Sequence, residues 1–205
     1  MHTVTETYTS DYRTRGSKFI GYLHPAAAAT DAEKFLIRVR DEHPSATHHC
    51  CAWRITPAQP TEFEQDDGEP KGTAGLPLLN AMRSADLINA VLVSVRYYGG
   101  TKLGKPGLIE AYGASAGLCI EKARLRKIIP VETWLLRYDY PLQSLIDKLR
   151  NDFPLIELES GYLEDVTLKL ACPADVSERF TGALKSIEHR LTLLEQTGTS
   201  YHIEK

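Results

Sequence analysis

The sequence lacks the long apolar segment and the leader that mark membrane and secreted proteins. No stretch of its 205 residues approaches the roughly 20 consecutive apolar residues that span a bilayer. Residues 1–11 are polar and rich in threonine, with no apolar centre and no basic start, so we do not expect a secretory signal. These absences favour a cytoplasmic protein that does not contact a membrane.

The sequence also has few cysteines and no excess of positive charge. Its four cysteines (Cys50, Cys51, Cys119 and Cys172) show no spacing typical of a disulfide framework, which favours free thiols in a reducing compartment. The formal net charge of −3 argues against a generic nucleic-acid coat, because such a protein needs a strongly basic surface. A local basic patch is still compatible with this charge. Hydrophobic residues make up 42% of the chain, which is enough for a sizeable core.

Up to Pro130, strand patterns and helix patterns alternate. Apolar residues spaced three and four apart predict an amphipathic helix that begins at the capping-box sequence Thr30–Glu33 and ends before Pro44. Thr73 is expected to cap a second, short helix, and a third, long helix follows residue 107. Strands are expected at 18–23, 47–55 and 90–98, the last of them buried on both faces.

Beyond Pro130 the expected order is β-α-β-β-α-β, which is the ferredoxin-like arrangement. A hairpin turn is expected at Ser160-Gly161, and the two helices begin at Pro141 and near Asp175. The four strands are expected at 132–140, 155–159, 162–170 and 191–203. We therefore predict an α+β protein with two separable domains, residues 1–130 and residues 131–205.

A glycine-rich segment lies between the strand at 90–98 and the long helix. Gly99, Gly104 and Lys105 have the spacing of a P-loop, in which backbone amides and a helix N-terminus hold a phosphate. The next residue of a P-loop is a serine or threonine that holds magnesium, but here it is Pro106. The residues favour a tight turn built of glycines, and they leave open a loop that binds an anion without hydrolysing it.

Three further clusters each have a functional and a structural interpretation. The carboxylates of the 66–69 loop could bind a hard cation or act as acid and base, although solvated turn residues are favoured. His48 and Cys50 share a strand face and could form half of a zinc site or a Cys–His pair, although buried thiols are favoured. The basic run 122–127 could contact phosphates or simply complement a helix end.

Three motifs follow one another in a fixed order. They are Ala46-Thr47-His48-His49-Cys50, then Asp66-Asp67-Gly68-Glu69-Pro70-x-Gly72-Thr73-Ala74-Gly75-x-Pro77, then Arg96-Tyr97-Tyr98-Gly99-Gly100-x-x-Leu103-Gly104 with Gly107-Leu108 and Ala111-Tyr112. In this order and spacing they resemble the signature of the IMPACT/YigZ family over about residues 15–125. The chain departs from that signature at Lys105, Pro106 and Glu110, where a small residue, a glycine and a basic residue are usual.

This resemblance implies a fold and a class of function. The N-terminal domain should have the ribosomal-protein-S5-domain-2-like fold, and the C-terminal domain should be similar to the last domain of elongation factor G. Eukaryotic relatives regulate translation by binding proteins rather than by catalysis. The two-domain architecture of bacterial relatives suggests contact with nucleic acid or the ribosome.

We therefore expect a non-enzymatic binding or regulatory protein whose partner is a translation-related protein, the ribosome or RNA. No catalytic residue, cofactor or metal site is predicted. The alternative is a hydrolase of a small phosphorylated or peptide-like substrate that uses His48 and the 66–69 carboxylates. The two glycine-rich loops should lie together and form the binding surface, which comprises His48, Asp66, Asp67, Glu69, Thr73, Arg96, Tyr97, Gly99, Gly100, Lys102, Gly104 and Lys105.

Overall fold

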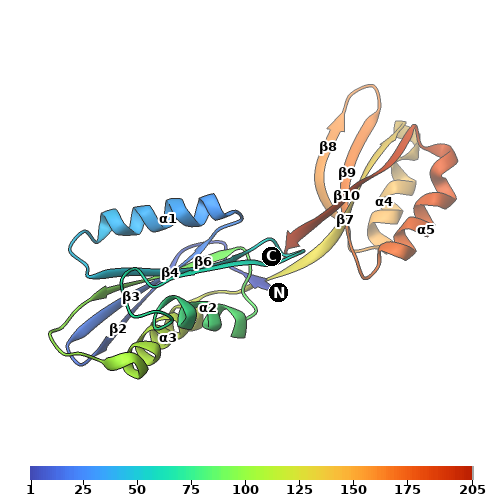
Figure 1. Cartoon of the computed structure of the whole chain (residues 1–205). Helices are drawn as coiled ribbons and strands as arrows, with labels where there is room; N and C mark the ends of the chain where they lie inside the picture. The colour runs from blue at the N-terminus through green and yellow to red at the C-terminus, as the bar shows by residue number, and fades with distance from the viewer. Residues whose placement is uncertain (205) are drawn as a thin grey trace. The chain divides into compact units, whose positions relative to one another are not determined.

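The computed structural model describes residues 1–204, which divide into two compact units at 1–127 and 128–204 (Figure 1). Both units combine helices and strands, so the predicted α+β class is confirmed. Whether residues 1–130 and 131–205 fold separately stays a prediction. None of the helices within residues 1–204 is long and apolar enough to cross a membrane.

The first unit is built on one antiparallel sheet with the strand order β2-β3-β6-β4-β5. The central strand β6 is buried from Ala90 to Arg96, as the apolar run predicted. The sheet strands are β2 (Tyr8–Thr14), β3 (Ser17–Pro25), β4 (His48–Ile55), β5 (Thr61–Gln65) and β6 (Ala90–Tyr97), and a short β1 (His2–Thr3) pairs with the beginning of β7. The edge strands β2 and β5 were not predicted, because both are polar and mostly exposed or half-buried.

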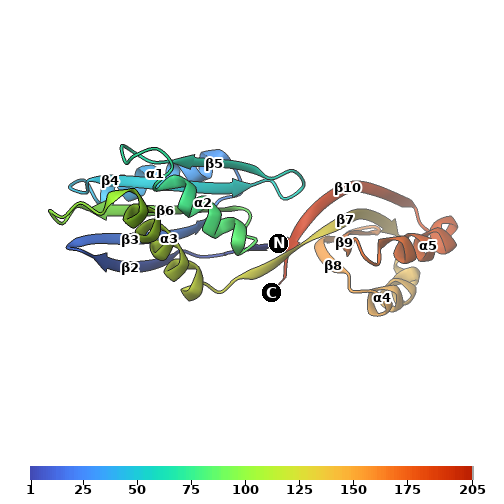
Figure 2. The same cartoon turned by 60° about the horizontal axis from the view of Figure 1, so that its bottom comes forward.

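Helices cover both faces of this sheet (Figures 1 and 2). Helix α1 (Ala29–Glu42) packs Phe35 and Val39 against one face, together with Trp53 of β4. Helices α2 (Gly75–Ser84) and α3 (Gly104–Lys122) close a second core on the opposite face. The loops that precede α2 and α3 therefore lie on the same side of the sheet.

The starts of α1 and α2 differ from the predicted ones. The N-cap of α1 is Ala28, whose backbone N–H donates to the carboxylate of Asp31 over 3.0 Å, so the capping box at Thr30 was wrong. Thr73 does not cap α2, because its hydroxyl donates to the carbonyl oxygen of Pro70. A carboxylate from the preceding loop replaces it, as described below.

The second unit has the strand order β10-β7-β9-β8, with all neighbours antiparallel. A sheet with this strand order and two helices packed on one face has the ferredoxin-like fold, as predicted (Figure 2). The hairpin turn lies at 163–165, not at Ser160-Gly161, which pair within the ladder. The elements are β7 (Arg126–Tyr138), η1 (Tyr140–Leu142), α4 (Gln143–Asp152), β8 (Ile156–Tyr162), β9 (Val166–Pro173), α5 (Ser177–Ile187), η2 (Glu188–Arg190) and β10 (Leu193–Ile203).

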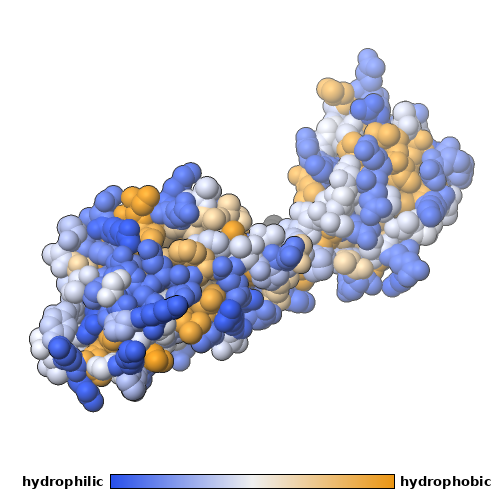
Figure 3. Space-filling view, viewed as in Figure 1, coloured by the Kyte–Doolittle hydropathy of each residue, from blue (hydrophilic) through white to orange (hydrophobic). Residues whose placement is uncertain are grey.

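Hydrophobic side chains are scattered over the surface. On the face seen in Figure 3, hydrophilic residues predominate over the first unit, and hydrophobic residues form separate patches among them. Exposed large hydrophobic residues occur in both units, for example Ile37 and Leu163. Single exposed hydrophobic residues are ordinary in globular proteins, so hydrophobicity alone does not mark a binding site here.

Candidate ligand-binding site

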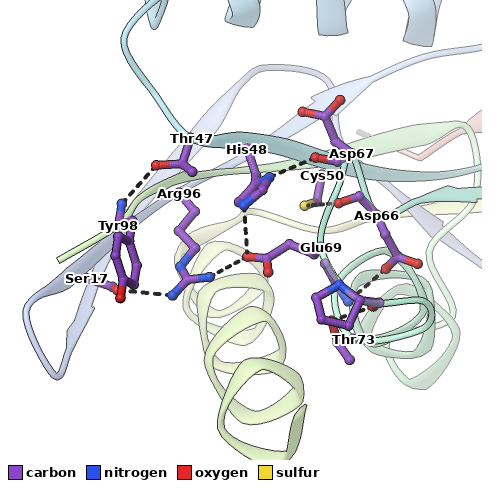
Figure 4. A network of polar contacts seen from close by, with 12 residues as sticks. Ser17, Thr47, His48, Cys50, Asp66, Asp67, Glu69, Thr73, Arg96 and Tyr98 are labelled. Atoms are coloured by element: carbon purple, nitrogen blue, oxygen red, sulfur yellow. Dashed lines mark hydrogen bonds and ion pairs between the residues drawn. The ribbon is translucent and has the colours of Figure 1, made fainter. Parts of the chain in front are cut away.

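A buried ion pair joins the 66–75 loop to the central strand. Strand β6 places Arg96, which is 5% exposed, beneath the loop, and its Nη1 donates to Oε1 of Glu69 over 2.6 Å. Its Nη2 donates to the hydroxyl of Ser17, the first residue of β3, over 3.3 Å (Figure 4). A buried charge is tolerated only when it is paired and hydrogen-bonded, so these contacts hold the loop against the sheet.

Glu69 is the centre of a closed polar network. In addition to Arg96, its Oε1 accepts a hydrogen bond of 2.8 Å from the hydroxyl of Tyr112 on α3. His48 lies on the other side, with Nε2 3.8 Å from the same oxygen and Nδ1 donating to the carbonyl oxygen of Asp67 (Figure 4). Only 8% of Glu69 is exposed, and its charge is engaged within the protein.

Asp66 caps helix α2 from the preceding loop. Its carboxylate accepts hydrogen bonds from the backbone N–H groups of Gly72, Ala74 and Gly75, at 2.7, 2.9 and 2.9 Å. These groups lie at and just before the helix N-terminus, where backbone donors lack intrahelical partners and negative charge is favourable. Asp66 is thus a structural residue and not the solvated turn residue that was expected.

Asp67 fixes the turn of the same loop. Its backbone lies in the left-handed region, with φ of 47°, which aspartate tolerates better than most residues. Its carboxylate accepts one bond from Nη2 of Arg40 on α1 and one from the backbone N–H of His49, both 2.7 Å long. All three carboxylates of the loop therefore have partners within the described residues.

The cysteines of β4 are buried thiols without the features of activated nucleophiles. Sγ of Cys50 lies 3.0 Å from the carbonyl oxygen of Asp66 and 3.3 Å from the hydroxyl of Tyr112, and it has no hydrogen bond to His48 among the described residues. Burial raises the pKa of the Cys50 thiol, and it raises the pKa of Cys51, which faces the opposite core, to about 12. Thiolate nucleophiles need the reverse shift. Among residues 1–204 no group of three or more His, Cys, Asp or Glu side chains could hold a metal ion.

A cavity of about 300 Å³ opens beside the buried ion pair. Lys102 and Lys105 are exposed at this cavity, and within the described residues neither has a hydrogen bond or an ion pair. The lining residues are Glu69, Pro70, Arg96, Tyr98, Lys102, Leu103, Gly104, Lys105 and Leu108. Three cations and one carboxylate give this cavity a positive charge, although the whole chain carries −3.

The glycines of the 99–104 loop have packing and backbone roles. A Cβ atom on Gly99 would lie 1.9 Å from the carbonyl carbon of Gly16, so only glycine allows this loop to cross the β2–β3 turn. Gly104 has φ of 71° and begins α3 with Leu103 as its N-cap. Pro106 falls in the first helical turn, where a missing N–H costs little. The segment is thus the tight glycine turn that was favoured from the sequence.

Comparison with known proteins places the chain in a family. The family described as Impact N-terminal domain matches residues 15–120. The chain belongs to the IMPACT family. An IMPACT family member from Haemophilus influenzae is 35% identical over 174 residues, covering 82% of each chain. YigZ of Escherichia coli is 34% identical over 172 residues (82% of this chain and 83% of YigZ), and YvyE of Bacillus subtilis is 33% identical over 195 residues (93% and 86%).

The architecture of this IMPACT-family chain also matches a crystal structure described as that of a hypothetical protein. The two chains are 30% identical, and the similarity covers 95% of this chain and 94% of the other, with a TM-score of 0.66. The similarity therefore extends over both units of this chain.

The structure brings together only part of the predicted surface. Glu69, Arg96, Lys102, Gly104 and Lys105 line one cavity, so the two glycine-rich loops do lie together, as predicted. The other predicted residues lie outside the cavity lining. His48 contacts Glu69 and the carbonyl oxygen of Asp67, and the 66–75 loop is held by hydrogen bonds of Asp66, Asp67 and Thr73. Gly99 packs on the β2–β3 turn, and Gly100 does not line the cavity.

The position of Tyr97 follows from strand alternation. Its hydroxyl bonds to Nδ1 of His43 and its ring packs with the α1 core, on the sheet face opposite to Arg96. Tyr98, two residues after Arg96, lines the cavity instead. The period of two along a strand was the available signal. The sequence placed Tyr112 in a motif but did not indicate its bond to Glu69, and it did not single out Ser17, because neither bond to the network depends on a local pattern.

Proposed function

We propose that this chain is a non-enzymatic binding protein connected with translation, which contacts ribosomal RNA in the cytoplasm through the cations of the cavity. The observation that carries the proposal is the pair of exposed, unpartnered lysines, Lys102 and Lys105, beside the buried cation Arg96 within the described residues. Lysines that have no carboxylate to pair with are free to neutralise phosphates. The family resemblance, which implies regulation of translation, supports the same class of partner.

The engagement of the loop carboxylates supports binding rather than hydrolysis. A general acid or base needs a carboxyl group that can reach the substrate and exchange its proton. Asp66 holds backbone amides, Asp67 holds Arg40, and Glu69 holds Arg96. A substrate would have to displace these bonds to recruit any of the three.

Co-sedimentation with purified Escherichia coli ribosomes over a range of salt concentrations tests the proposal. The association constant of the wild type should fall linearly with salt on logarithmic axes, because binding releases counterions. The Lys102→Ala/Lys105→Ala variant should bind several-fold more weakly at low salt, with a slope that is smaller by about one unit per lost phosphate contact. At high salt the two proteins should bind alike.

A matched control removes two lysines from the second unit. Lys148 on α4 and Lys185 on α5 are also exposed, and Lys148→Ala/Lys185→Ala changes the net charge by the same amount. This variant should keep the wild-type slope. Association that does not depend on salt, or that survives ribonuclease treatment unchanged, would contradict the RNA contact and favour a protein partner.

A further inference from the structure

The cavity combines an apolar wall with a cationic rim. Pro70, Leu103, Leu108 and the ring of Tyr98 form the apolar part. The exposed ammonium groups of Lys102 and Lys105 form the rim, at the N-terminus of the 19-residue helix α3, where the helix dipole adds to the positive potential. A ligand that fits both parts has an apolar, planar body and an anionic end.

Arg96 has hydrogen-bonding capacity that the protein does not use. Its guanidinium carries five N–H donors, and its bonds to Glu69 and Ser17 occupy one donor each on Nη1 and Nη2. Its buried Nε has no partner among the described residues. Buried donors of this kind are rare in native proteins, because leaving one unpaired is costly. Because Arg96 also lines the cavity, a ligand there would lie beside a guanidinium whose donors the protein leaves partly unpaired.

Tyr98 supplies a surface on which a flat ring can stack. The side chain is large, yet 46% of the residue is exposed, and Cζ of Arg96 lies 5.4 Å from its ring centroid. Its backbone N–H donates to the hydroxyl of Thr47, so the backbone of Tyr98 is held in place by a bond that does not involve the ring. Aromatic rings and arginine planes are the common stacking partners of unpaired bases.

We propose that the cavity binds a single nucleotide, with its base against Tyr98 and the apolar wall and its phosphate at Lys102 and Lys105. The volume of about 300 Å³ lies at the lower end of small-ligand pockets, so it suits one nucleotide and excludes a base-paired duplex. This inference rests on the proposed RNA contact and names its chemistry: an unpaired nucleotide, either free or within a single strand.

Fluorescence anisotropy of the full chain with labelled single-stranded oligoadenylate tests this inference. The matched probe is an abasic oligonucleotide of equal length, which keeps the phosphates and lacks the bases. Tyr98→Ala should weaken oligoadenylate binding roughly tenfold, since stacking on one aromatic side chain contributes about 1–3 kcal/mol per base. It should leave abasic binding unchanged, and Tyr98→Phe should behave as the wild type. Lys102→Ala/Lys105→Ala should weaken the binding of both probes.

Competition distinguishes the two sources of the nucleotide. Displacement of the probe by AMP, at concentrations where inorganic phosphate has no effect, identifies a free nucleotide as the ligand. Displacement by unlabelled oligoadenylate alone identifies a strand.

Equal binding of oligoadenylate by the wild type and by a folded Tyr98→Ala variant would overturn the nucleotide inference. The same holds if the wild type binds the two probes equally. If the ribosome association constant still depends less steeply on salt in the lysine variant, the proposed function stands without the nucleotide site. If Tyr98-dependent nucleotide binding occurs without any ribosome association, the proposed function is the part that fails.

Discussion

Replacing Glu69 by glutamine should strongly destabilise the first unit. The change keeps the size and an acceptor oxygen of the side chain but removes its charge. Arg96, which is 5% exposed, is then left buried without a counter-ion. The hydroxyl of Tyr112 also loses its charged acceptor. Replacing one carboxylate oxygen of Glu69 by an amide nitrogen therefore removes the negative charge that compensates a buried arginine.

The magnitude follows from two opposing terms. Over the 2.6 Å between Nη1 and Oε1, the Coulomb attraction is roughly 6 kcal/mol at an effective dielectric constant of about 20. The desolvation of two buried ions costs several kcal/mol each, so the intact pair adds little net stability. The variant keeps the desolvation cost of Arg96 and loses the attraction. We expect a loss of about 3–5 kcal/mol, a large part of a typical domain stability of about 5–15 kcal/mol.

Urea unfolding of the full chain measures this loss. The chain has two tryptophans, Trp53 in the first unit and Trp134 in the second, so a Trp134→Phe background reports on the first unit alone. Glu69→Gln, Arg96→Met and the double variant complete a double-mutant cycle, in which we expect a coupling energy of about 2 kcal/mol.

Glu110→Gln is the matched control, because Glu110 is exposed on α3. This substitution should change the free energy of unfolding by no more than about 0.5 kcal/mol. A loss below about 1 kcal/mol for Glu69→Gln, or a coupling energy near zero, would refute the reasoning.

The same assay serves other predictions. The two units should unfold independently, so single-tryptophan variants that retain Trp53 or Trp134 should give different urea midpoints, and coincident transitions would indicate one cooperative unit. Asp66→Ala should cost the first unit about 2–4 kcal/mol, because three backbone N–H groups lose a charged acceptor, and Asp66→Asn should cost less; equal losses would show that the charge has no role. Burial lowers the pKa of His24 and His43, so the unfolded chain takes up protons first as the pH falls. Stability should be complete above the unfolded pKa of about 6.5 and decline below it. The melting temperature of His24→Gln/His43→Gln should decline less over that range, and parallel curves for the two proteins would contradict the assignment.

Elements with a strong local pattern were predictable from the sequence. The continuous apolar run of β6 indicated a strand buried on both faces, and the apolar stripes of α1 and α3 indicated which side chains enter the core. The order β-α-β-β-α-β restricted the second unit to one common fold, since short connections allow few alternatives. The polar edge strands β2 and β5 carried no such signal, because a strand with little buried surface needs no apolar pattern.

The sequence by itself determined that two glycine-rich loops and Arg96 occur in an order typical of the IMPACT family. Only the tertiary structure decided what each polar residue does. Glu69 finds Arg96 27 positions further along the chain and Tyr112 43 positions further along, because sheet pairing and the docking of α3 bring them together. Asp66 replaces Thr73 at the start of α2 because the loop folds back over the helix. Hydrogen-bond partners of this kind depend on packing between distant segments, which local residue patterns do not encode.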